Sequence, residues 1–240
     1  MSSNKPKSQK RLQWLLVLSV IITVILYTTG PLGKTIGYPL ILLSTLAHEM
    51  GHGIVAILVG GKFESFQMWA DGSGIARTQY SGRFASALVS AGGLCGPAIV
   101  AALFFALSNK QKWARVSLAT VGIALLIADV LIVRSFFGLF FVGVLGALFL
   151  WIATKGPVWS SEFTLVFVAV QLALSVFSRG DYLFTPVAHT SGGELPSDVA
   201  QMSNALFLPY WFWGALCGAF SVAVLIWGLL FFFKIKGQKK

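Results

Sequence analysis

The sequence predicts an all-α polytopic membrane protein with six or seven transmembrane helices and one short β-hairpin. Composition is the first reason. Of the 240 residues, 56% are hydrophobic and only 11% are charged, and the mean hydropathy is +0.80, whereas soluble domains contain about 25% charged residues. The second reason is that the apolar residues gather in runs long enough to cross a bilayer, which takes about 20 residues per helix.

The apolar runs define the expected organisation of the chain. We expect a polar, disordered basic tail at residues 1–12, a single transmembrane domain at 13–233, and a second basic tail at 234–240. The predicted spans are 13–29, 38–59, 84–107, 113–133, 136–153, 163–177 and 206–233. The run at 163–177 is the weakest, so the count is six or seven. With seven spans the lysines and arginines divide equally between the two sides, and the positive-inside rule selects no orientation.

The net charge of +10 does not indicate a nucleic-acid-binding protein. The lysines and arginines mostly flank apolar runs, where they meet anionic lipid headgroups. No basic helix or basic-aromatic stripe of the kind that binds nucleic acid is present. The expected partners are therefore the lipid bilayer and membrane-protein substrates, with no nucleic acid. Cys95 and Cys217 lie in apolar runs without a Cys-x-x-Cys spacing, which is typical of small core residues.

The second run contains the most informative motif, His48-Glu49-Met50-Gly51-His52. On a helix, His48 and His52 are about one turn apart, so both imidazoles leave the same face. Two neutral imidazoles on one face can occupy two corners of a zinc tetrahedron. Glu49 is rotated by about 100° from His48, beside the metal position, where it can act as the general base of a metalloprotease.

A hydrogen-bonded polar cluster that only joins helices is the alternative reading of this motif. Ionisable groups at membrane depth each cost roughly 2.5 kcal/mol or more on insertion scales, so three of them together require a function. We therefore predict a zinc site.

The segments that follow support a site built around this helix. Gly60-Gly61 predicts a left-handed helix cap. Residues 62–80 predict a hairpin, because Asp71-Gly-Ser-Gly74 is a strong turn signal. This hairpin is either a plain surface feature or an edge strand that holds an extended substrate. Small residues at 91–98 predict close packing of the third span against the zinc helix, and Asp129 and Arg134 are expected to pair near one membrane interface.

Two histidines leave a catalytic zinc site incomplete, because such a site has three protein ligands and an open position. The polar segment 178–206 offers three candidates: His189, Asp181 and Asp198. Asp198 also follows Ser197 at a predicted helix start, where an acidic residue is favoured on purely structural grounds.

Several of these motifs together resemble the bacterial site-2-protease-like membrane metallopeptidases, in particular their compact branch without soluble domains. The resemblance rests on Thr45–Gly53, Val59–Gly61, the Asp71–Gly74 turn, the Gly96-Pro97 helix and Arg134-x-x-Phe137-Gly138, and it continues through Ser197–Gln201 and Pro209-x-x-Phe212-Trp213. It implies a zinc-dependent endopeptidase in the bacterial cell membrane that cuts membrane-embedded substrates, with two histidines and one aspartate as ligands.

The resemblance assigns His48, His52 and Asp198 as ligands of Zn²⁺ and Glu49 as the catalytic residue. The Asn-Pro-Asp-Gly-like motif that carries the aspartate in other site-2 proteases is missing here. In the compact branch a Ser-Asp-Ala-like segment occupies the comparable late position, and Ser197-Asp198-Val199 matches it. Asp181 is the reserve candidate, followed by His189.

Two other function classes share some of these features. A catalytically inactive zinc-binding membrane scaffold would keep every residue named above. A transporter with an intramembrane metal or proton site would show paired repeats with broken helices in both halves, whereas Gly-Pro occurs within an apolar span only at Gly96-Pro97.

Overall fold

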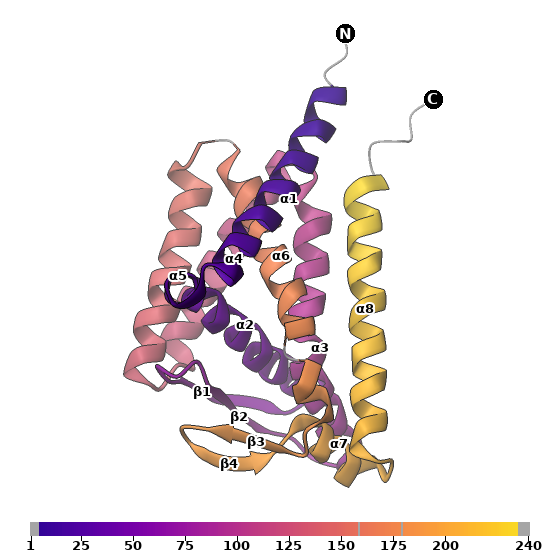
Figure 1. The fold of residues 1–240 in the computed structure, drawn as a ribbon. Helices are drawn as coiled ribbons and strands as arrows, with labels where there is room; N and C mark the ends of the chain where they lie inside the picture. The colour runs from indigo at the N-terminus through magenta and orange to yellow at the C-terminus, as the bar shows by residue number, and fades with distance from the viewer. Residues whose placement is uncertain (1–4, 158, 179, 235–240) are drawn as a thin grey trace.

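The computed structural model describes residues 5–157, 159–178 and 180–234. These residues form eight α-helices, a 3-10 helix and two small β-hairpins (Figure 1). The elements are α1 (Lys5–Thr28), α2 (Gly30–Leu58), β1 (Lys62–Met68), β2 (Gly74–Gln79), α3 (Arg83–Ser108), α4 (Gln111–Leu131), α5 (Phe136–Lys155), α6 (Ser160–Ser178), η1 (Gly180–Phe184), β3 (Val187–Thr190), β4 (Gly193–Pro196), α7 (Asp198–Leu206) and α8 (Tyr210–Lys234).

The fold class confirms the prediction of an all-α, multi-pass integral membrane protein. In the described part of the chain, six helical segments are long and apolar enough to cross a membrane: Thr35–Leu58 of α2, the helices α3, α4 and α5, Ser160–Phe184 and Tyr210–Phe233. Of the predicted first span at 13–29, residues 13–28 lie in α1, which is not among these six segments. That helix already begins at Lys5, so part of the tail predicted to be disordered is helical.

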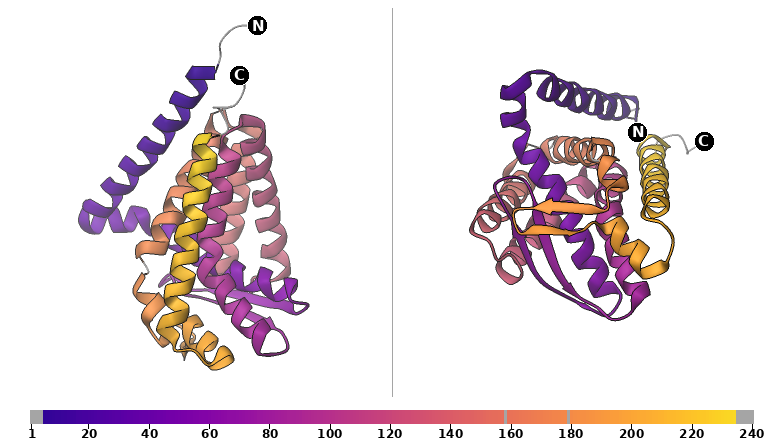
Figure 2. Two further views of the ribbon diagram at one scale, coloured as in Figure 1. Left: turned by 90° about the vertical axis from the view of Figure 1, so that its right-hand side faces the viewer. Right: turned by 60° about the horizontal axis from the view of Figure 1, so that its bottom comes forward.

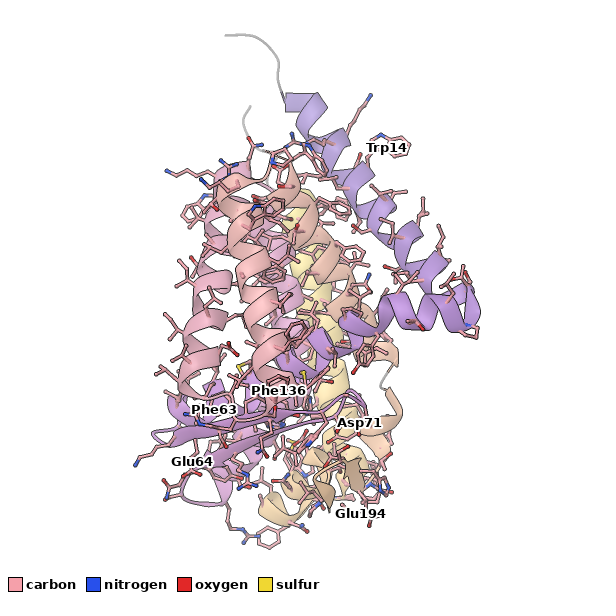
Figure 3. All side chains as sticks on the ribbon, turned by 90° about the vertical axis from the view of Figure 1, so that its left-hand side faces the viewer. Trp14, Phe63, Glu64, Asp71, Phe136 and Glu194 are labelled. Atoms are coloured by element: carbon pink, nitrogen blue, oxygen red, sulfur yellow. The ribbon has the colours of Figure 1, made fainter. Side chains whose placement is uncertain are left out.

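The long helices run side by side, and the two ends of the bundle differ. The start of α1 and the end of α8 lie at one end, whereas both hairpins and α7 lie at the other (Figures 1 and 2). Trp14 projects outward near the first end, and Phe63, Glu64 and Phe136 lie near the second (Figure 3). α1 leans against α6, to which it is tied by the Arg11–Glu162 ion pair and a hydrogen bond from Gln171 to Thr23.

Helix α3 is central to the bundle and packs directly on α2 through glycines. A Cβ at Gly92 would lie 2.5 Å from the Val55 side chain, and a Cβ at Gly51 would lie 2.2 Å from the Gly92 carbonyl oxygen. A Cβ at Gly96 would lie 3.0 Å from the carbonyl oxygen of Ala47. The predicted close packing of the third span against the helix that carries the two histidines is thereby confirmed.

The first hairpin forms as predicted. Gly60 ends α2 in the left-handed region at φ 82°, and Gly72 makes the turn at φ 87°, with Met68 opposite Gly74. The outer edge of β1 is occupied, because Phe66 N donates to Ile132 O and Arg134 N donates to Phe66 O, both at 2.8 Å.

The predicted pairing of Asp129 with Arg134 is wrong. The Arg134 guanidinium donates to the carbonyl oxygens of Val130, Leu131 and Val133 at the end of α4, where a cation also complements the helix dipole.

A second hairpin, β3–β4, was not expected. The glycines and the proline of this segment are typical of irregular structure, yet Val187–Thr190 pairs with Gly193–Pro196 in four-residue strands. Gly193 adopts φ 116° at the turn, a conformation that favours glycine. Such short strands carry too little hydrophobic alternation to be recognised from the sequence.

Candidate metal centre

The two histidines of α2 point toward a common position. His48 and His52 are one turn apart, and their Nε2 atoms lie 3.2 Å from each other. His52 Nδ1 lies 2.8 Å from the carbonyl oxygen of Val89 in α3. This contact favours the tautomer in which Nδ1 donates its proton to the carbonyl and Nε2 keeps a free lone pair for a metal.

Helix α3 also fixes the position of the His52 ring. A Cβ at Gly93 would lie 2.2 Å from His52 Nε2, so only a glycine leaves room for the imidazole. The His52 ring is thus held from both sides, by a backbone acceptor and by a backbone surface without a side chain.

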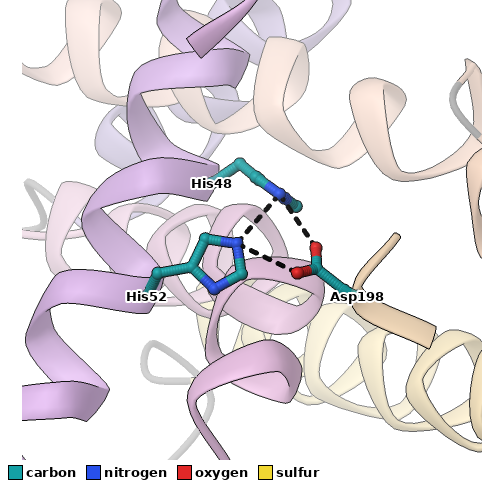
Figure 4. Close-up of side chains that lie close together, drawn as sticks. All are labelled: His48, His52 and Asp198. Atoms are coloured by element: carbon teal, nitrogen blue, oxygen red, sulfur yellow. Dashed lines mark hydrogen bonds and ion pairs between the residues drawn. The ribbon is translucent and has the colours of Figure 1, made fainter. Parts of the chain in front are cut away.

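Asp198 completes the group from the opposite side, at the first residue of α7 (Figure 4). Its Oδ2 lies 3.1 Å from His48 Nε2, and its Oδ1 lies 3.3 Å from His52 Nε2. Potential ligand atoms of the three residues all lie within 4.8 Å of one another. Residues 150 positions apart therefore meet at one point.

The residue that caps α7 is not Asp198 but its neighbour Ser197. Ser197 is the N-cap, and its hydroxyl accepts from Ala200 N at 3.3 Å and donates to Thr185 O at 2.5 Å. Since Ser197 satisfies the helix terminus, the Asp198 carboxylate is free to face the histidines.

The Asp198 carboxylate is buried without full hydrogen bonding. Only 4% of the residue is exposed, and Oδ2 receives no hydrogen bond of acceptable geometry, although a buried polar group normally has a partner. Burial by itself raises the pKa of this carboxyl, but the neighbouring imidazoles of His52 and His48 outweigh it and hold the pKa below its ordinary value. The lowered pKa favours the ionised carboxylate, which is the form that binds a metal.

Glu49 lies beside this group but outside it. Its carboxylate accepts a hydrogen bond from Ala76 N of β2 at 2.7 Å, and only 7% of the residue is exposed. Gly74 packs against the same side chain, because a Cβ there would lie 3.0 Å from Glu49 Cγ. The first hairpin thus positions Glu49 next to the cluster.

Of the other two candidates for the third ligand, only His189 has a described side chain, and it does not join the cluster. His189 is on β3, its side chain is 72% exposed, and it pairs with Glu194 at 3.2 Å. Asp181 lies in η1, and its side chain is outside the described residues. Among the described residues, only His48, His52 and Asp198 form a group of three that could hold a metal ion.

Three contributions to the site had no recognisable signal in the sequence. The carbonyl of Val89 and the N–H of Ala76 are backbone groups, which any residue type supplies. Tyr182, whose ring lies 5.9 Å from that of His48, is an aromatic residue in a polar segment whose charged residues are the ligand candidates. Gly93 belongs to the small residues that predict helix packing, and it also makes room for His52.

Two hollows adjoin the cluster. The larger, about 380 Å³, extends from His48 and Glu49 between α2, α3, α6 and α8, and it includes Ser44, Ser175 and Ser221. The smaller, about 120 Å³, contains His48, His52 and Asp198 and lies between β2 and the second hairpin. The cluster is therefore reachable both from the interior of the bundle and from the hairpin end.

The donor set fits a zinc ion. Two imidazole nitrogens and one carboxylate oxygen are a ligand set found in catalytic zinc sites with an open fourth position. The incompletely bonded Asp198 oxygen gains a partner once a cation lies between the three side chains.

Comparison with protein-family models matches residues 15–228 to a family described as Peptidase M50B-like. No curated protein and no solved structure matches the chain. The matched range includes α2, both hairpins and α7, and with them every residue of the cluster.

Proposed function

The chain belongs to the Peptidase M50B-like family, and on that basis we propose that it is an intramembrane zinc metalloendopeptidase that hydrolyses peptide bonds of membrane-embedded proteins. The observation that carries the proposal is the buried cluster of His48, His52 and Asp198, with Glu49 beside it. Peptidases of the M50 family are typically zinc-dependent, which agrees with this donor set.

In the proposed mechanism His48, His52 and Asp198 hold Zn²⁺. The bound ion would lower the pKa of a water molecule and polarise a peptide carbonyl. Glu49 accepts the proton of the attacking water and delivers it to the departing amine nitrogen. To do so its carboxylate exchanges the hydrogen bond from Ala76 N for one from water.

The substrate must present an extended backbone, because a helix in lipid has no free carbonyl to offer. The outer edge of β2, which carries the Ala76 N–H next to Glu49, is suited to bind such a segment by strand addition. This favours the edge-strand interpretation of the first hairpin over a plain surface feature.

The test compares wild-type protein with Glu49→Gln. Purified wild-type protein should contain about one Zn²⁺ per chain. In cells, the wild type should cleave co-expressed single-span membrane reporters with destabilised helices. Glu49→Gln should keep the zinc, while cleavage falls by roughly 10²–10⁴-fold because an amide cannot accept the proton. Loss of zinc in Glu49→Gln would make Glu49 a ligand and refute the mechanism.

An inactive zinc-binding scaffold is distinguished in the same experiment. It would contain zinc in both proteins, and wild type and Glu49→Gln would leave every reporter uncut.

A further inference from the structure

The second hairpin, β3–β4, forms a wall of both hollows beside the cluster. Ala188 and Thr190 of β3 line the larger and the smaller one alike. Across the smaller hollow they face Ala76 and Thr78 of β2. The strands follow one another in the order β1, β2, β3, β4 at this end of the molecule (Figure 1). The cluster therefore lies in a groove between two hairpins.

Both strands that border the groove have an open edge. Within the described residues, β2 pairs only with β1, and β3 pairs only with β4. The other edge of β1 is occupied by residues 132–134. Open edges bind an extended chain through their N–H and C=O groups. Two such edges border the same groove here, and on β2 the Ala76 N–H already donates to Glu49.

The tips of the two hairpins are joined by hydrogen bonds. Ser191 Oγ donates to Asp71 Oδ2 at 2.5 Å, and Ser191 N donates to Ser73 Oγ at 3.3 Å. Asp71 Oδ1 in turn accepts from Ser73 N and Ser73 Oγ. We call the contact between Ser191 and the Asp71–Ser73 turn the latch. It is exposed, and an exposed hydrogen bond contributes little net stability because water replaces it.

The base of the second hairpin is fixed in a different way. Ser197 N donates to Pro186 O at 3.0 Å, and Ser197 Oγ donates to Thr185 O. These bonds join the two ends of the hairpin directly before Asp198. The tip can therefore move away from β2 while the base, and Asp198 with it, stays in place.

The groove is narrow in the structure. About 120 Å³ is well below the roughly 300–1,000 Å³ of ordinary ligand pockets, and it cannot hold an extended peptide. We propose that β3–β4 is a movable clamp, which opens when the latch releases and admits an extended peptide segment between the edges of β2 and β3. The clamp rests on the proposed function, and its test is chosen so that the two can fail separately.

The first measurement is hydrogen exchange, which needs no catalytic activity. In the full-length protein, Ser191→Ala should speed exchange about twofold in residues 187–196 and in residues 74–79, while residues 62–68 keep their wild-type rates. Thr154→Ala is the matched control, because it also removes an exposed hydroxyl, at the end of α5. Unchanged exchange in Ser191→Ala would refute the clamp.

The second measurement locks the latch covalently. In the double variant Asp71→Cys/Ser191→Cys, diamide removes two hydrogens from the thiols, forms a disulfide and is itself reduced to the hydrazine. Reporter cleavage should fall at least tenfold, and dithiothreitol should restore it, with the zinc content constant throughout. The two single-cysteine variants should not respond, which controls for the buried Cys95 and Cys217.

Full cleavage by the locked protein would overturn the clamp and leave the protease proposal intact. Absence of cleavage in every form, reduced wild type included, would count against the protease proposal, and hydrogen exchange would still decide on the clamp.

Discussion

Residues 38–80 and residues 180–206 each build one side of the metal centre, and the two sides are held in different ways. The first side is pinned along its whole length. Thr45 Oγ1 donates to Gly72 O at 2.7 Å, Tyr38 OH donates to Ala70 O at 2.5 Å, and β1 is bonded to residues 132–134. The second side is fixed at its base by Ser197. In the described residues it meets the first side at the cluster, at the Tyr182–His48 ring contact, where Gly192 packs on Trp69 and Ile75, and at the latch.

The difference indicates that the two sides of the metal centre have different roles. In the proposed mechanism the fixed side supplies two ligands, the general base and one strand edge, all between His48 and Gln79. The less constrained side would supply one ligand at its base and the hairpin that we propose to move. A protease whose substrate must enter a narrow groove needs a preorganised set of reacting groups and also a segment that can move to admit the substrate.

The largest effect should come from removing one ligand on either side. We expect His52→Ala and Asp198→Ala each to lower zinc affinity by more than about 100-fold, beyond the 10–100-fold that loss of an outer-shell partner costs. The measurement is zinc per chain after dialysis against a weak chelator, at matched expression. His189→Ala and Asp181→Ala are the controls. Zinc retained by Asp198→Ala but lost from Asp181→Ala would transfer the ligand role to Asp181.

The sequence predicted the fixed side well, because its signals are local. The spacing of His48 and His52, the Gly60-Gly61 cap and the Asp71–Gly74 turn each depend on a few consecutive residues, and the structure shows the helix, cap and hairpin that they indicate. The small residues around Gly92 likewise predicted the packing of α3 on α2.

The second side was predicted less well, because its position depends on contacts between residues distant in sequence. Ser191 bonds to Asp71 across 120 positions, and strands of four residues have no hydrophobic pattern of their own. The resemblance assigns Asp198 as the third ligand, because the residues alone do not decide between Asp198, Asp181 and His189. The proximity of Asp198 to the histidines, and the fact that Ser197 caps the helix in its place, are visible only in three dimensions.

A smaller effect should follow from disturbing the fixed side without removing a ligand. In Gly93→Ala the new methyl group would collide with the His52 ring and displace it from Val89 O. We expect zinc affinity to fall about 10–100-fold, as when an outer-shell contact is lost. Gly37→Ala is the matched control, because it lies in the same helix as His52 with no atom within 4 Å of the new Cβ. Equal zinc affinity in both variants would show that the His52 ring is not confined by α3.

Loss of a hydroxyl group should lower the free energy of unfolding more at the fixed first hairpin than at the movable second hairpin. Ser135 Oγ accepts from Met68 N at 2.9 Å and donates to Met68 O at 3.0 Å, and Met68 is fully buried. Ser135→Ala should therefore cost about 1–3 kcal/mol of unfolding free energy, since it leaves buried backbone groups unpaired. Ser191→Ala should stay within about 0.5 kcal/mol, as exposed substitutions do. The thermal midpoint in detergent is the measurement, and a larger loss in Ser191→Ala would reverse the assignment of fixed and movable sides.

The smallest effect concerns pH and acts only on the movable side. Hydrogen bonds from Ser191 and Ser73 hold the pKa of Asp71 below its ordinary value. A carboxyl whose pKa is lower in the folded state stabilises that state above its unfolded value, about 3.9, and the contribution is lost as the pH falls through the folded pKa. The ionisable groups nearby are Tyr38 on α2 and the His189–Glu194 pair on the second hairpin. Opening of residues 187–196, measured by hydrogen exchange corrected for intrinsic rates, should thus be constant from pH 8 to pH 5 and rise only below about pH 4.

In Asp71→Asn, residues 187–196 should open more readily at neutral pH, and the rise in opening at acid pH should be absent. A step that persists in Asp71→Asn would assign the acid response to another group and leave the latch without a role in it.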